Sequence, residues 1–485
     1  MTVLELPSVT GGELRGSEGG WIDVRNPARS DEIVGRVPAS TEREVRGAVD
    51  AAAAGFESWS TRSHAERGEV LRRAGALVRE REDSIARAVT AEMGKTLAEA
   101  RAETARSGDF LDYYGSLSRA PQGELLPDAR DGVDAQLRAQ PLGAVVAITP
   151  WNDPLLTPAR KLAPALFAGN SVIIKPASET PLSTLLLATA LHDAGIDGGA
   201  VNTVTGPASR VVDPLLDDDR IAAVTFTGST DVGLDLQRRL AGRNLRLQTE
   251  MGGKNPAVVL GDADLDLTAD SIAAAAFGQA GQRCTATSRV IVVDDVADAL
   301  VERLIDRAER IVVGPGDAPD TTMGPLASER QMRSVLADVE RAMEQGATMA
   351  FGTGRLTDGP LAAGWFVSPF VLTGVTPSME IWRREVFGPV LTVTAVPSLA
   401  HAVEAANDSG YGLAAALFSS DVASTREFIE RVEAGQVAVN LPTTGWDVHL
   451  PFGGWKLSGS GFKEQGLEGL RFYTRLKTVA VRAAA

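Results

Sequence analysis

The chain has 485 residues, 44% hydrophobic and 23% charged, a composition ordinary for a globular enzyme of about three domains. Its formal net charge is −15 and no block of Lys or Arg could follow a phosphate backbone, so we expect neither nucleic acid nor an anionic membrane as partner. A single cysteine excludes an internal disulfide, and with no leader-like N-terminus and no apolar run of about 18 residues, the sequence predicts a cytoplasmic protein.

The first 140 residues change character twice. Residues 1–40 read as extended and turn-rich, whereas from Thr41 onward apolar residues recur at helical spacing and predict a helical segment. Residues 119–140 lose the helical period and alternate only weakly, which by itself predicts a loop.

From residue 142 the chain alternates short apolar strands with helices. We predict strands at 142–149, 171–175, 201–205 and 221–226, with helices at 155–167, 181–193 and 230–240. After Gly253 the pattern restarts, with strands at 258–260, 290–293, 366–372, 390–396, 414–418 and 436–440 and helices at 296–310 and 330–345. This alternation predicts the α/β class, with two mostly parallel sheets covered on both faces and a cleft near the break between them.

The only cysteine, Cys284, lies on a glycine-rich segment between a predicted helix and a predicted strand. A lone thiol is most often a small buried hydrophobe. Such a structural cysteine would not need Gly278, Gly281 and the polar pair Gln282-Arg283 beside it, so we interpret Cys284 as a nucleophile. Arg283 would lower the pKa of the thiol if its charge pointed inward.

Glu250 is the better candidate for the base that would serve this nucleophile. None of the four histidines lies in a comparable glycine-rich setting, whereas Glu250 closes a predicted strand immediately before Gly252-Gly253. Taken alone, a solvated loop glutamate is an equally good interpretation of this position.

Five motifs now resemble those of the aldehyde dehydrogenase superfamily, in the family's order. They are Pro150-Trp151-Asn152 (oxyanion), Glu250 to Lys254 (glutamate), Gly281 to Cys284 (nucleophile), Arg384 to Val390 (coenzyme ribose) and Pro451 to Gly461 (C-terminal signature). The stretch from Lys463 to Thr474 looks most like the 2-oxoglutarate semialdehyde branch.

The resemblance implies two Rossmann-like α/β domains and a small β oligomerisation module. On this reading residues 1–118 and 142–252 bind NAD(P), residues 253–453 form the catalytic domain, and residues 119–141 and 454–485 join in the module of a homodimer or homotetramer.

The same resemblance implies a mechanism. The Cys284 thiolate would attack an aldehyde carbon, and the Asn152 amide with the Cys284 backbone N–H would hold the oxyanion. After hydride transfer to the nicotinamide, Glu250 would activate the water that releases the acid. Members that pass the acyl group to coenzyme A typically lack this glutamate, so its presence predicts hydrolysis.

No G-x-G-x-x-G motif follows a strand, but the strand that ends at Phe226 feeds a helix beginning at Thr230 or Asp231, whose free amides suit a phosphate. By resemblance, Gly228 and Ser229 contact the pyrophosphate. The other coenzyme-binding positions that the resemblance implies are Thr149, Trp151, Lys175, Ser178, Gly206, Gly252, Glu385 and Phe387.

Ser178 stands where NAD-preferring members often carry a glutamate that repels a 2′-phosphate. We therefore favour NADP or dual use, although the adjacent Glu179 could compensate. The family usually has an acidic residue where this chain has Arg384.

Arg160 occupies a position that is often aromatic in members acting on apolar aldehydes. A guanidinium there can hold a carboxylate, which predicts an anionic semialdehyde such as 2-oxoglutarate or succinic semialdehyde. Arg283, Thr285 and Trp446 are expected to line the same pocket, and Asp153 is interpreted as pairing with an arginine.

Other readings remain open at this point. Arg160 can be a surface charge, and the substrate can then be an uncharged aldehyde, while a phosphorylated triose is the runner-up anion. A cysteine hydrolase or acyltransferase and an inactive dinucleotide-binding scaffold are alternatives from other classes. No metal site is expected.

Overall fold

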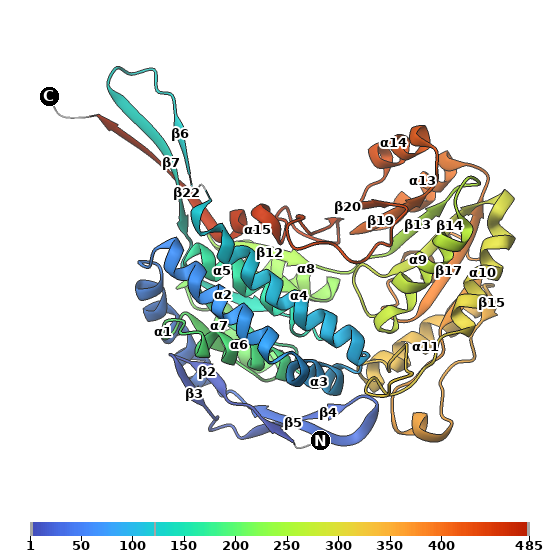
Figure 1. The fold of residues 1–485 in the computed structure, drawn as a ribbon, viewed down its shortest axis with the longest axis horizontal. Helices are drawn as coiled ribbons and strands as arrows, with labels where there is room; N and C mark the ends of the chain where they lie inside the picture. The colour runs from blue at the N-terminus through green and yellow to red at the C-terminus, as the bar shows by residue number, and fades with distance from the viewer. Residues whose placement is uncertain (1–2, 121–122, 483–485) are drawn as a thin grey trace.

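This computed structural model describes residues 3–120 and 123–482. Two α/β lobes lie side by side, and an arm of three strands projects from the first lobe together with the C-terminus (Figure 1). The predicted α/β class is confirmed by two mainly parallel sheets with helices on both faces.

The first lobe is built on a five-stranded sheet of order β10-β9-β8-β11-β12, in which every neighbouring pair is parallel. Its strands are β8 (Ala144–Ile148), β9 (Ser171–Lys175), β10 (Val201–Thr203), β11 (Ile221–Thr227) and β12 (Arg246–Glu250). The chain runs outward from β8 on one side and restarts at β11 on the other. The strand order therefore reverses between β8 and β11, where α/β sheets bind their ligands.

Helices cover both faces of this sheet, and their apolar side chains form a core on each face. One core contains residues of α2 (His64–Glu80), α4 (Leu97–Ser116), α5 (Leu156–Ala168) and α6 (Leu182–Asp193). The opposite core contains residues of α1 (Glu42–Trp59), α7 (Ala208–Leu216) and α8 (Thr230–Leu240). α3 (Glu82–Met93) packs against α4 and α6.

Local sequence fixes where these N-terminal helices begin. Thr41, Ser63 and Thr96 each form a capping box with the glutamate three residues later, which satisfies two amide donors at the start of α1, α2 and α4. The segment before them, predicted only as extended, forms β1 (Leu4–Glu5), β2 (Ser8–Thr10), β3 (Glu13–Arg15), β4 (Trp21–Asn26) and β5 (Arg29–Pro38).

The second lobe holds a seven-stranded sheet of order β15-β16-β17-β14-β13-β19-β20, parallel except for the β15–β16 pair. Its strands are β13 (Asn255–Val259), β14 (Thr287–Val293), β15 (Thr348–Phe351), β16 (Phe370–Thr373), β17 (Val390–Val396), β19 (Ala414–Phe418) and β20 (Gln436–Val439). The strand predicted to start at Phe366 begins four residues later, and β15 was not predicted.

Helices again lie on both faces of the second sheet. α9 (Leu265–Phe277), α10 (Ala297–Glu309) and α11 (Glu329–Glu344) contribute to one core, and α13 (Leu399–Asn407) and α14 (Val422–Arg431) to the other. Other short elements include α12 (Glu380–Arg383), β18 (Tyr411–Gly412), β21 (Trp455–Lys456) and α15 (Gly466–Tyr473).

The arm is an antiparallel sheet of β6 (Gly123–Leu126), β7 (Val133–Pro141) and β22 (Thr474–Arg482). β22 pairs with β7 along its full length, from Thr474 opposite Pro141 to Arg482 opposite Val133. Periodicity alone predicted a loop before residue 141, and the alternation is weak because most arm residues are exposed or only half-buried. Residues 121–122 and 483–485 of the predicted module lie outside the described residues.

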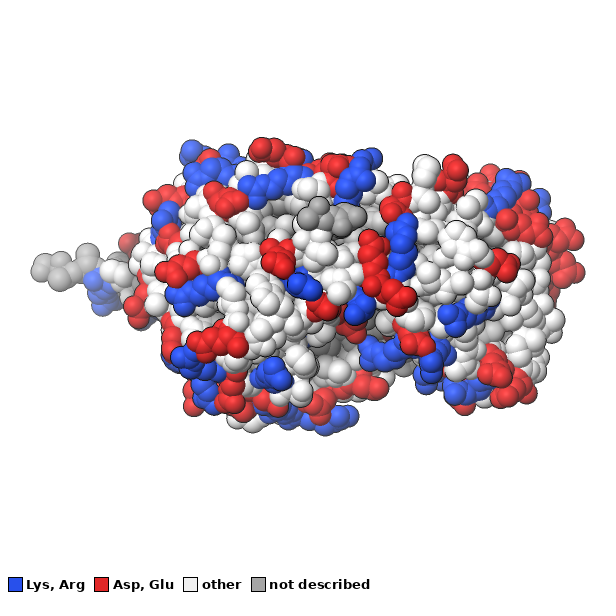
Figure 2. Space-filling model, turned by 90° about the horizontal axis from the view of Figure 1, so that it is seen from below, with Lys and Arg blue, Asp and Glu red and all other residues white. Residues whose placement is uncertain are grey.

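Acidic and basic side chains are interspersed over the face seen in Figure 2 rather than gathered by sign. Within residues 3–120 and 123–482, no helix combines the length and the apolar character that a bilayer crossing requires.

Candidate active site

Cys284 lies on a short, irregular connection between α9 and β14. Before it come Gln279, Ala280 and Gly281, with φ of 54°, 53° and 67°, so three consecutive residues are left-handed. At Gly281 a Cβ would lie 2.2 Å from the carbonyl oxygen of Gly388, so only glycine fits. Left-handed non-glycine residues are costly and persist where the surroundings over-determine them.

The Cys284 backbone is held by Asn255 at the start of β13. Its Nδ2 donates to the carbonyl oxygens of Cys284 and Ala286, both at 2.8 Å, and its Oδ1 accepts from the Ala414 N–H at 3.0 Å. Two parallel strands of the second sheet therefore anchor the loop that carries the thiol.

Burial raises the pKa of the Cys284 thiol to about 12. The charge of Arg160 opposes this rise, whereas the charges of Asp153, Glu385 and Glu250 add to it. Three predicted site residues, Arg160, Glu385 and Glu250, thus act on the thiol together with Asp153. The cation that most favours the thiolate is Arg160, not the neighbouring Arg283 considered from sequence. The Arg283 Nε donates to the Gln279 Oε1 at 2.9 Å.

Asn152 is buried beside the nucleophile loop. Its Nδ2 donates to the carbonyl oxygen of Gln282 at 3.0 Å, and its own carbonyl oxygen accepts from the Gln279 side chain. An amide nitrogen carries two hydrogens, and only one of them is used in the bond to Gln282. The second hydrogen of the Asn152 amide is therefore available close to the Cys284 loop.

Glu250 ends β12 and is buried, with only a 3.4 Å contact from the Gln248 Nε2 to its Oε1. Its Oε2 has no hydrogen-bonding partner among the described residues. Burial, reinforced by the charge of Glu464, raises the pKa of Glu250 well above its usual range, and the cations Lys161 and Lys463 oppose the rise. The carboxyl is therefore a strong base once ionised.

Glu464 was missed by sequence reasoning as a member of this cluster. Lys161 Nζ makes an ion pair with the Glu464 carboxylate and donates to the Thr225 Oγ1 at 2.8 Å. The positive charges of Lys161 and Arg160 overcome burial and hold the pKa of Glu464 below its usual value. Glu464 reaches Lys161 because the C-terminal segment runs back to the first lobe.

A pocket of about 120 Å³ adjoins the nucleophile loop, and all four predicted substrate residues line it: Arg160, Arg283, Thr285 and Trp446. The pocket takes its walls from α4, α5, the Cys284 loop and residues 444–446. Phe110 and Phe452 also line it, and its wall combines these aromatic rings with four cations (Lys95, Arg106, Arg160 and Arg283) and three acids (Glu99, Glu103 and Asp153).

Arg160 projects from α5 into this pocket. Its guanidinium carbon lies 4.5 Å from the centroid of Phe452, and its Nη1 lies 3.7 Å from the Glu464 Oε2, beyond hydrogen-bond reach. The buried Nε of Arg160 has no partner among the described residues. The interpretation of Arg160 as a surface charge is therefore wrong, because only 11% of its side chain is exposed.

Arg106 is a third pocket arginine that sequence reasoning missed. From α4 its Nη2 donates to the carbonyl oxygens of Gly445 at 3.2 Å and Trp446 at 2.8 Å. Burial lowers the pKa of Arg106, and the nearby charges of Arg160 and Arg283 lower it further. The three guanidinium groups are thus close enough to repel one another.

Asp153 does not pair with an arginine as expected. Its Oδ1 lies 3.0 Å from the Nζ of Lys95, which is buried and also bonds Glu103. Glu103 in turn accepts from the backbone N–H groups of Leu155 and Leu156. This buried triad fixes the start of α5, and therefore the position of Arg160.

The crevice at the carboxyl ends of β8 and β11 has the features of a dinucleotide site. The buried hydroxyls of Thr149 and Thr227 lack partners among the described residues. Ser229 occupies the N-cap position of α8, but its side chain accepts no hydrogen bond from the first backbone amides of that helix. Gly228 lies in the turn between β11 and α8, and its N–H donates to the Glu250 carbonyl oxygen. These unpaired groups fit a nucleotide phosphate.

Lys175 ends β9 on one side of this crevice. Its Nζ has no hydrogen-bonding partner among the described residues, and burial lowers its pKa while the charge of Glu179 opposes the change. Ser178 Oγ donates at 3.3 Å to the carbonyl oxygen of Gly206, whose φ is 140°. Three predicted coenzyme residues therefore lie around one corner.

Glu385 and Phe387 approach the crevice from the second lobe. Glu385 Oε1 accepts from the Gly253 N–H at 2.8 Å, and a Cβ at Gly252 would lie 2.2 Å from its Oε2. Burial raises the pKa of Glu385 to about 7. Phe387 packs edge-on against Trp151, with ring centroids 5.3 Å apart.

Arg384, which stands where the family usually has an acidic residue, forms an ion pair. Its Nε lies 2.9 Å from the Oδ1 of Asp338, a buried residue of α11. The basic residue is therefore matched by an acid, which ties the segment carrying Glu385 to that helix.

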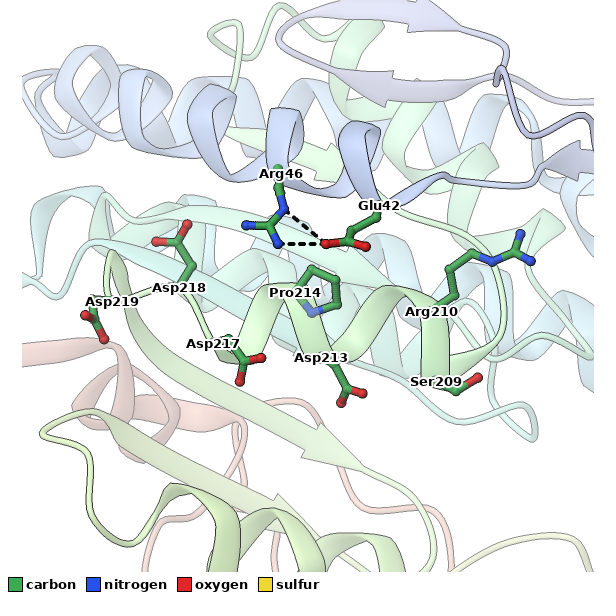
Figure 3. A pocket seen from close by; sticks show the side chains of 9 residues that line it. All are labelled: Glu42, Arg46, Ser209, Arg210, Asp213, Pro214, Asp217, Asp218 and Asp219. Carbon is green, nitrogen blue, oxygen red and sulfur yellow. Dashed lines mark hydrogen bonds and ion pairs between the residues drawn. The ribbon is translucent and has the colours of Figure 1, made fainter.

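A second, larger pocket lies between α1 and α7 and has no part in this chemistry (Figure 3). None of the predicted site residues lines its roughly 730 Å³. Its acids are paired: Glu42 with Arg46, Asp213 and Asp217 with Arg239, and Asp218 with Arg220.

Two doubly covered, mainly parallel sheets, with a cysteine, a carboxyl group and a nucleotide-type crevice between them, are typical of an α/β enzyme of the dehydrogenase type. The sequence profile of the aldehyde dehydrogenase family matches residues 14–479. The chain is 38% identical to the alpha-ketoglutaric semialdehyde dehydrogenase of Bacillus subtilis (98% and 97% of the two chains covered) and 40% identical to the 2,5-dioxopentanoate dehydrogenase of Saccharolobus solfataricus (96% and 97%).

A crystal structure of betaine aldehyde dehydrogenase from Staphylococcus aureus in complex with NAD+ is similar throughout, with a TM-score of 0.95, 33% identity and coverage of 99% of this chain and 95% of that one. The chain belongs to the aldehyde dehydrogenase family. The predicted family and fold are confirmed, and the protein is an oxidoreductase that oxidises aldehydes. A cysteine hydrolase and an inactive scaffold lose their support.

Proposed function

We propose that this enzyme oxidises the semialdehyde of a dicarboxylic acid, with 2-oxoglutarate semialdehyde as the preferred substrate, to the dicarboxylate. The observation that carries the proposal is the pocket beside Cys284, into which Arg106, Arg160 and Arg283 all project. Mutual repulsion among them is relieved by an anion, and the unpaired Arg160 Nε provides a directed donor.

The names of the two relatives support the same choice. 2,5-Dioxopentanoate is the chemical name of 2-oxoglutarate semialdehyde, so both relatives are named for one substrate. This substrate has the two ends that the site requires, because an anion at Arg160 must leave the other end of the molecule, the aldehyde, free to reach Cys284.

In the proposed reaction Cys284 releases its proton to solvent, and its sulfur attacks the aldehyde carbon, forming a thiohemiacetal. Arg160 opposes the effect of burial on the thiol and so favours the thiolate. The free Asn152 amide hydrogen and the Cys284 N–H would donate to the oxyanion that forms. A bound nicotinamide would supply the hydride acceptor, and loss of the hydride from this carbon would leave a thioester on Cys284.

Glu250 would then take a proton from water, whose oxygen attacks the thioester carbon and releases the acid and the Cys284 thiol. Its raised pKa makes it an effective base, and the adjacent Lys161–Glu464 pair is connected to it electrostatically. A buried carboxyl in this position supports hydrolysis over transfer to another thiol.

For the coenzyme, we propose that Lys175 and Ser178 hold the adenosine ribose, Thr149, Gly206, Gly228 and Ser229 the phosphates and their surroundings, and Trp151, Gly252, Glu385 and Phe387 the nicotinamide half. Ser178 carries no charge that would repel a 2′-phosphate, so both NADP and NAD are expected to bind. The related structure in complex with NAD+ supports the site as a whole.

We also propose the domain limits given by the motifs, with residues 1–118 and 142–252 as the coenzyme domain and 253–453 as the catalytic domain.

Both edges of the arm, β6 and β22, are free of further strands in the described residues, and Leu125, Leu476 and Val481 are exposed there. Such edges and side chains favour assembly into a homodimer or homotetramer, which light scattering after gel filtration would measure.

The experiment that tests the substrate is a comparison of initial rates at about 340 nm for four aldehydes: 2-oxoglutarate semialdehyde, succinic semialdehyde, glyceraldehyde 3-phosphate and pentanal. Arg160→Leu should lower kcat/KM for the first about 30-fold more than for pentanal, because a buried charge-assisted hydrogen bond to the carboxylate is lost, whereas the loss of the charge that favours the Cys284 thiolate affects both aldehydes alike. Arg46→Leu, an exposed arginine of α1, is the control. Equal losses for the acid and for pentanal would refute the assignment, and a preference for the phosphate would move it to a triose.

A further inference from the structure

One ion pair connects the two lobes at the ribose corner of the coenzyme crevice. Arg330, in the first turn of α11, places its Nη2 3.2 Å from the Oε1 of Glu179. Glu179 follows Ser178 directly and lies close enough to Lys175 for its charge to affect the pKa of that lysine. A carboxylate is therefore flanked by two cations where the adenosine ribose would lie.

The start of α11 holds Arg330 in a defined place. The Nε2 of Gln331 donates to the carbonyl oxygens of Val386 at 3.2 Å and Phe387 at 2.9 Å, and Ser328 caps the helix. Just before the helix, the Ala327 N–H donates to the Gln282 Oε1 at 3.0 Å. The helix start is thus fixed to both the Phe387 segment and the Cys284 loop, so Arg330 extends from a rigid base across to Glu179.

The charge of Glu179 decides which coenzyme this corner can accept. A 2′-phosphate carries close to two negative charges, and an unpaired carboxylate beside it would repel it. With Arg330 in place the carboxylate is neutralised, and Lys175 remains as an uncompensated cation. NAD has only a hydroxyl at this position, so its binding is indifferent to this balance.

We propose that Arg330 is a coenzyme-specificity residue, which neutralises Glu179 across the cleft and thereby lets this site bind NADP as well as NAD. The inference rests on the coenzyme site proposed above, but not on the identity of the aldehyde. Arg330 acts through Glu179 and makes no contact of its own with the coenzyme.

The test is fluorescence titration of the protein with NADPH and NADH in the absence of any aldehyde. Arg330→Ala should raise the Kd for NADPH about fivefold and change that for NADH less than about twofold, because only the phosphate meets the unmasked carboxylate. Arg333→Ala removes a similar exposed arginine one turn along α11, paired with Glu329, and should change neither value.

The second half of the test is a double-mutant cycle with Glu179→Gln, which keeps the side-chain shape and removes the charge. In that background Arg330→Ala should cost less than about twofold in NADPH affinity. An equal loss in both backgrounds would overturn the inference, because Arg330 would then contact the phosphate itself. Equal losses for NADH and NADPH, or no binding of NADPH by the unaltered protein, would overturn it too. None of these results depends on which aldehyde is oxidised.

Salt gives an independent check. The Arg330 side chain is 81% exposed and that of Glu179 33% exposed, so their interaction and the repulsion that it masks are screened by ions. The difference in NADPH affinity between Arg330→Ala and the unaltered protein should shrink as KCl rises from 0.02 to about 0.5 M. A difference that persists at high salt would contradict an electrostatic origin.

Discussion

The Nδ2 of Asn152 lies 3.0 Å from the carbonyl oxygen of Gln282, two residues before Cys284. This bond joins the end of the first lobe's β8 segment to the nucleophile loop of the second lobe. The same amide therefore has two tasks in our proposal: it holds the loop, and its remaining hydrogen receives the oxyanion.

Asn152→Ala separates these tasks. Loss of one oxyanion donor should lower kcat about 100-fold with little change in KM, because the donor acts mainly in the transition state. Alkylation of Cys284 by iodoacetamide reports the position of the loop and should change less than about threefold, because Asn255 still holds the loop through the carbonyl oxygens of Cys284 and Ala286. If alkylation and kcat fall in parallel, Asn152 only holds the loop.

The pH dependence of that alkylation follows from burial of the thiol. Because the pKa of Cys284 is raised to about 12, the thiol is protonated at neutral pH in the coenzyme-free protein. The alkylation rate should therefore rise about tenfold per pH unit from pH 7 to 10. Arg160→Leu should slow it at every pH, since the charge that favours the thiolate is removed, whereas Arg46→Leu should not. A plateau below pH 9 would contradict the raised pKa.

Glu250→Gln should block hydrolysis of the thioester but not the steps before it. Hydride transfer does not need the base, so a burst of one NAD(P)H per active site should survive, while steady-state turnover falls about 100-fold or more. Hydroxylamine attacks thioesters without a base and should restore turnover. A variant that loses the burst as well would place Glu250 before hydride transfer, against our assignment.

The sequence predicts Cys284 and Glu250 as catalytic residues because each is a reactive group in a glycine-rich segment, which is a local property. It did not locate Arg106 or Glu464. Arg106 lies on α4 and meets residues 445–446, more than 300 positions away, and Glu464 reaches Lys161 at a similar separation. Such contacts depend on how the lobes pack. For the same reason Asp153 was given an arginine as partner, although buried Lys95 holds it.

Arg106 offers a test of the three-arginine pocket. Arg106→Leu removes a charge and frees the carbonyls of Gly445 and Trp446, so KM for 2-oxoglutarate semialdehyde should rise about tenfold with kcat within about threefold. Arg106→Lys keeps a cation that can donate to both carbonyls and should recover most of the loss. Arg101→Leu, an exposed residue of the same helix paired with Asp83, is the control. An unchanged KM with a lower kcat would contradict a role in binding.

In the buried triad of Lys95, Glu103 and Asp153, the Lys95 ammonium group is the cation that pairs with both carboxylates. We therefore expect its removal to lower the free energy of unfolding. Lys95→Met leaves two carboxylates without their cation, which should reduce the free energy of unfolding by about 3–5 kcal/mol. Burial already raises the pKa of Glu103 against the opposing charge of Lys95, so without Lys95 it rises further. A carboxyl whose folded pKa lies above its unfolded value stabilises the fold at low pH and loses that contribution as pH rises. The deficit measured by urea unfolding should therefore be larger at pH 8 than at pH 5, while Lys477→Met, on the exposed face of the arm, should show no deficit at either pH. A deficit independent of pH would mean that packing, not charge, is what Lys95 supplies.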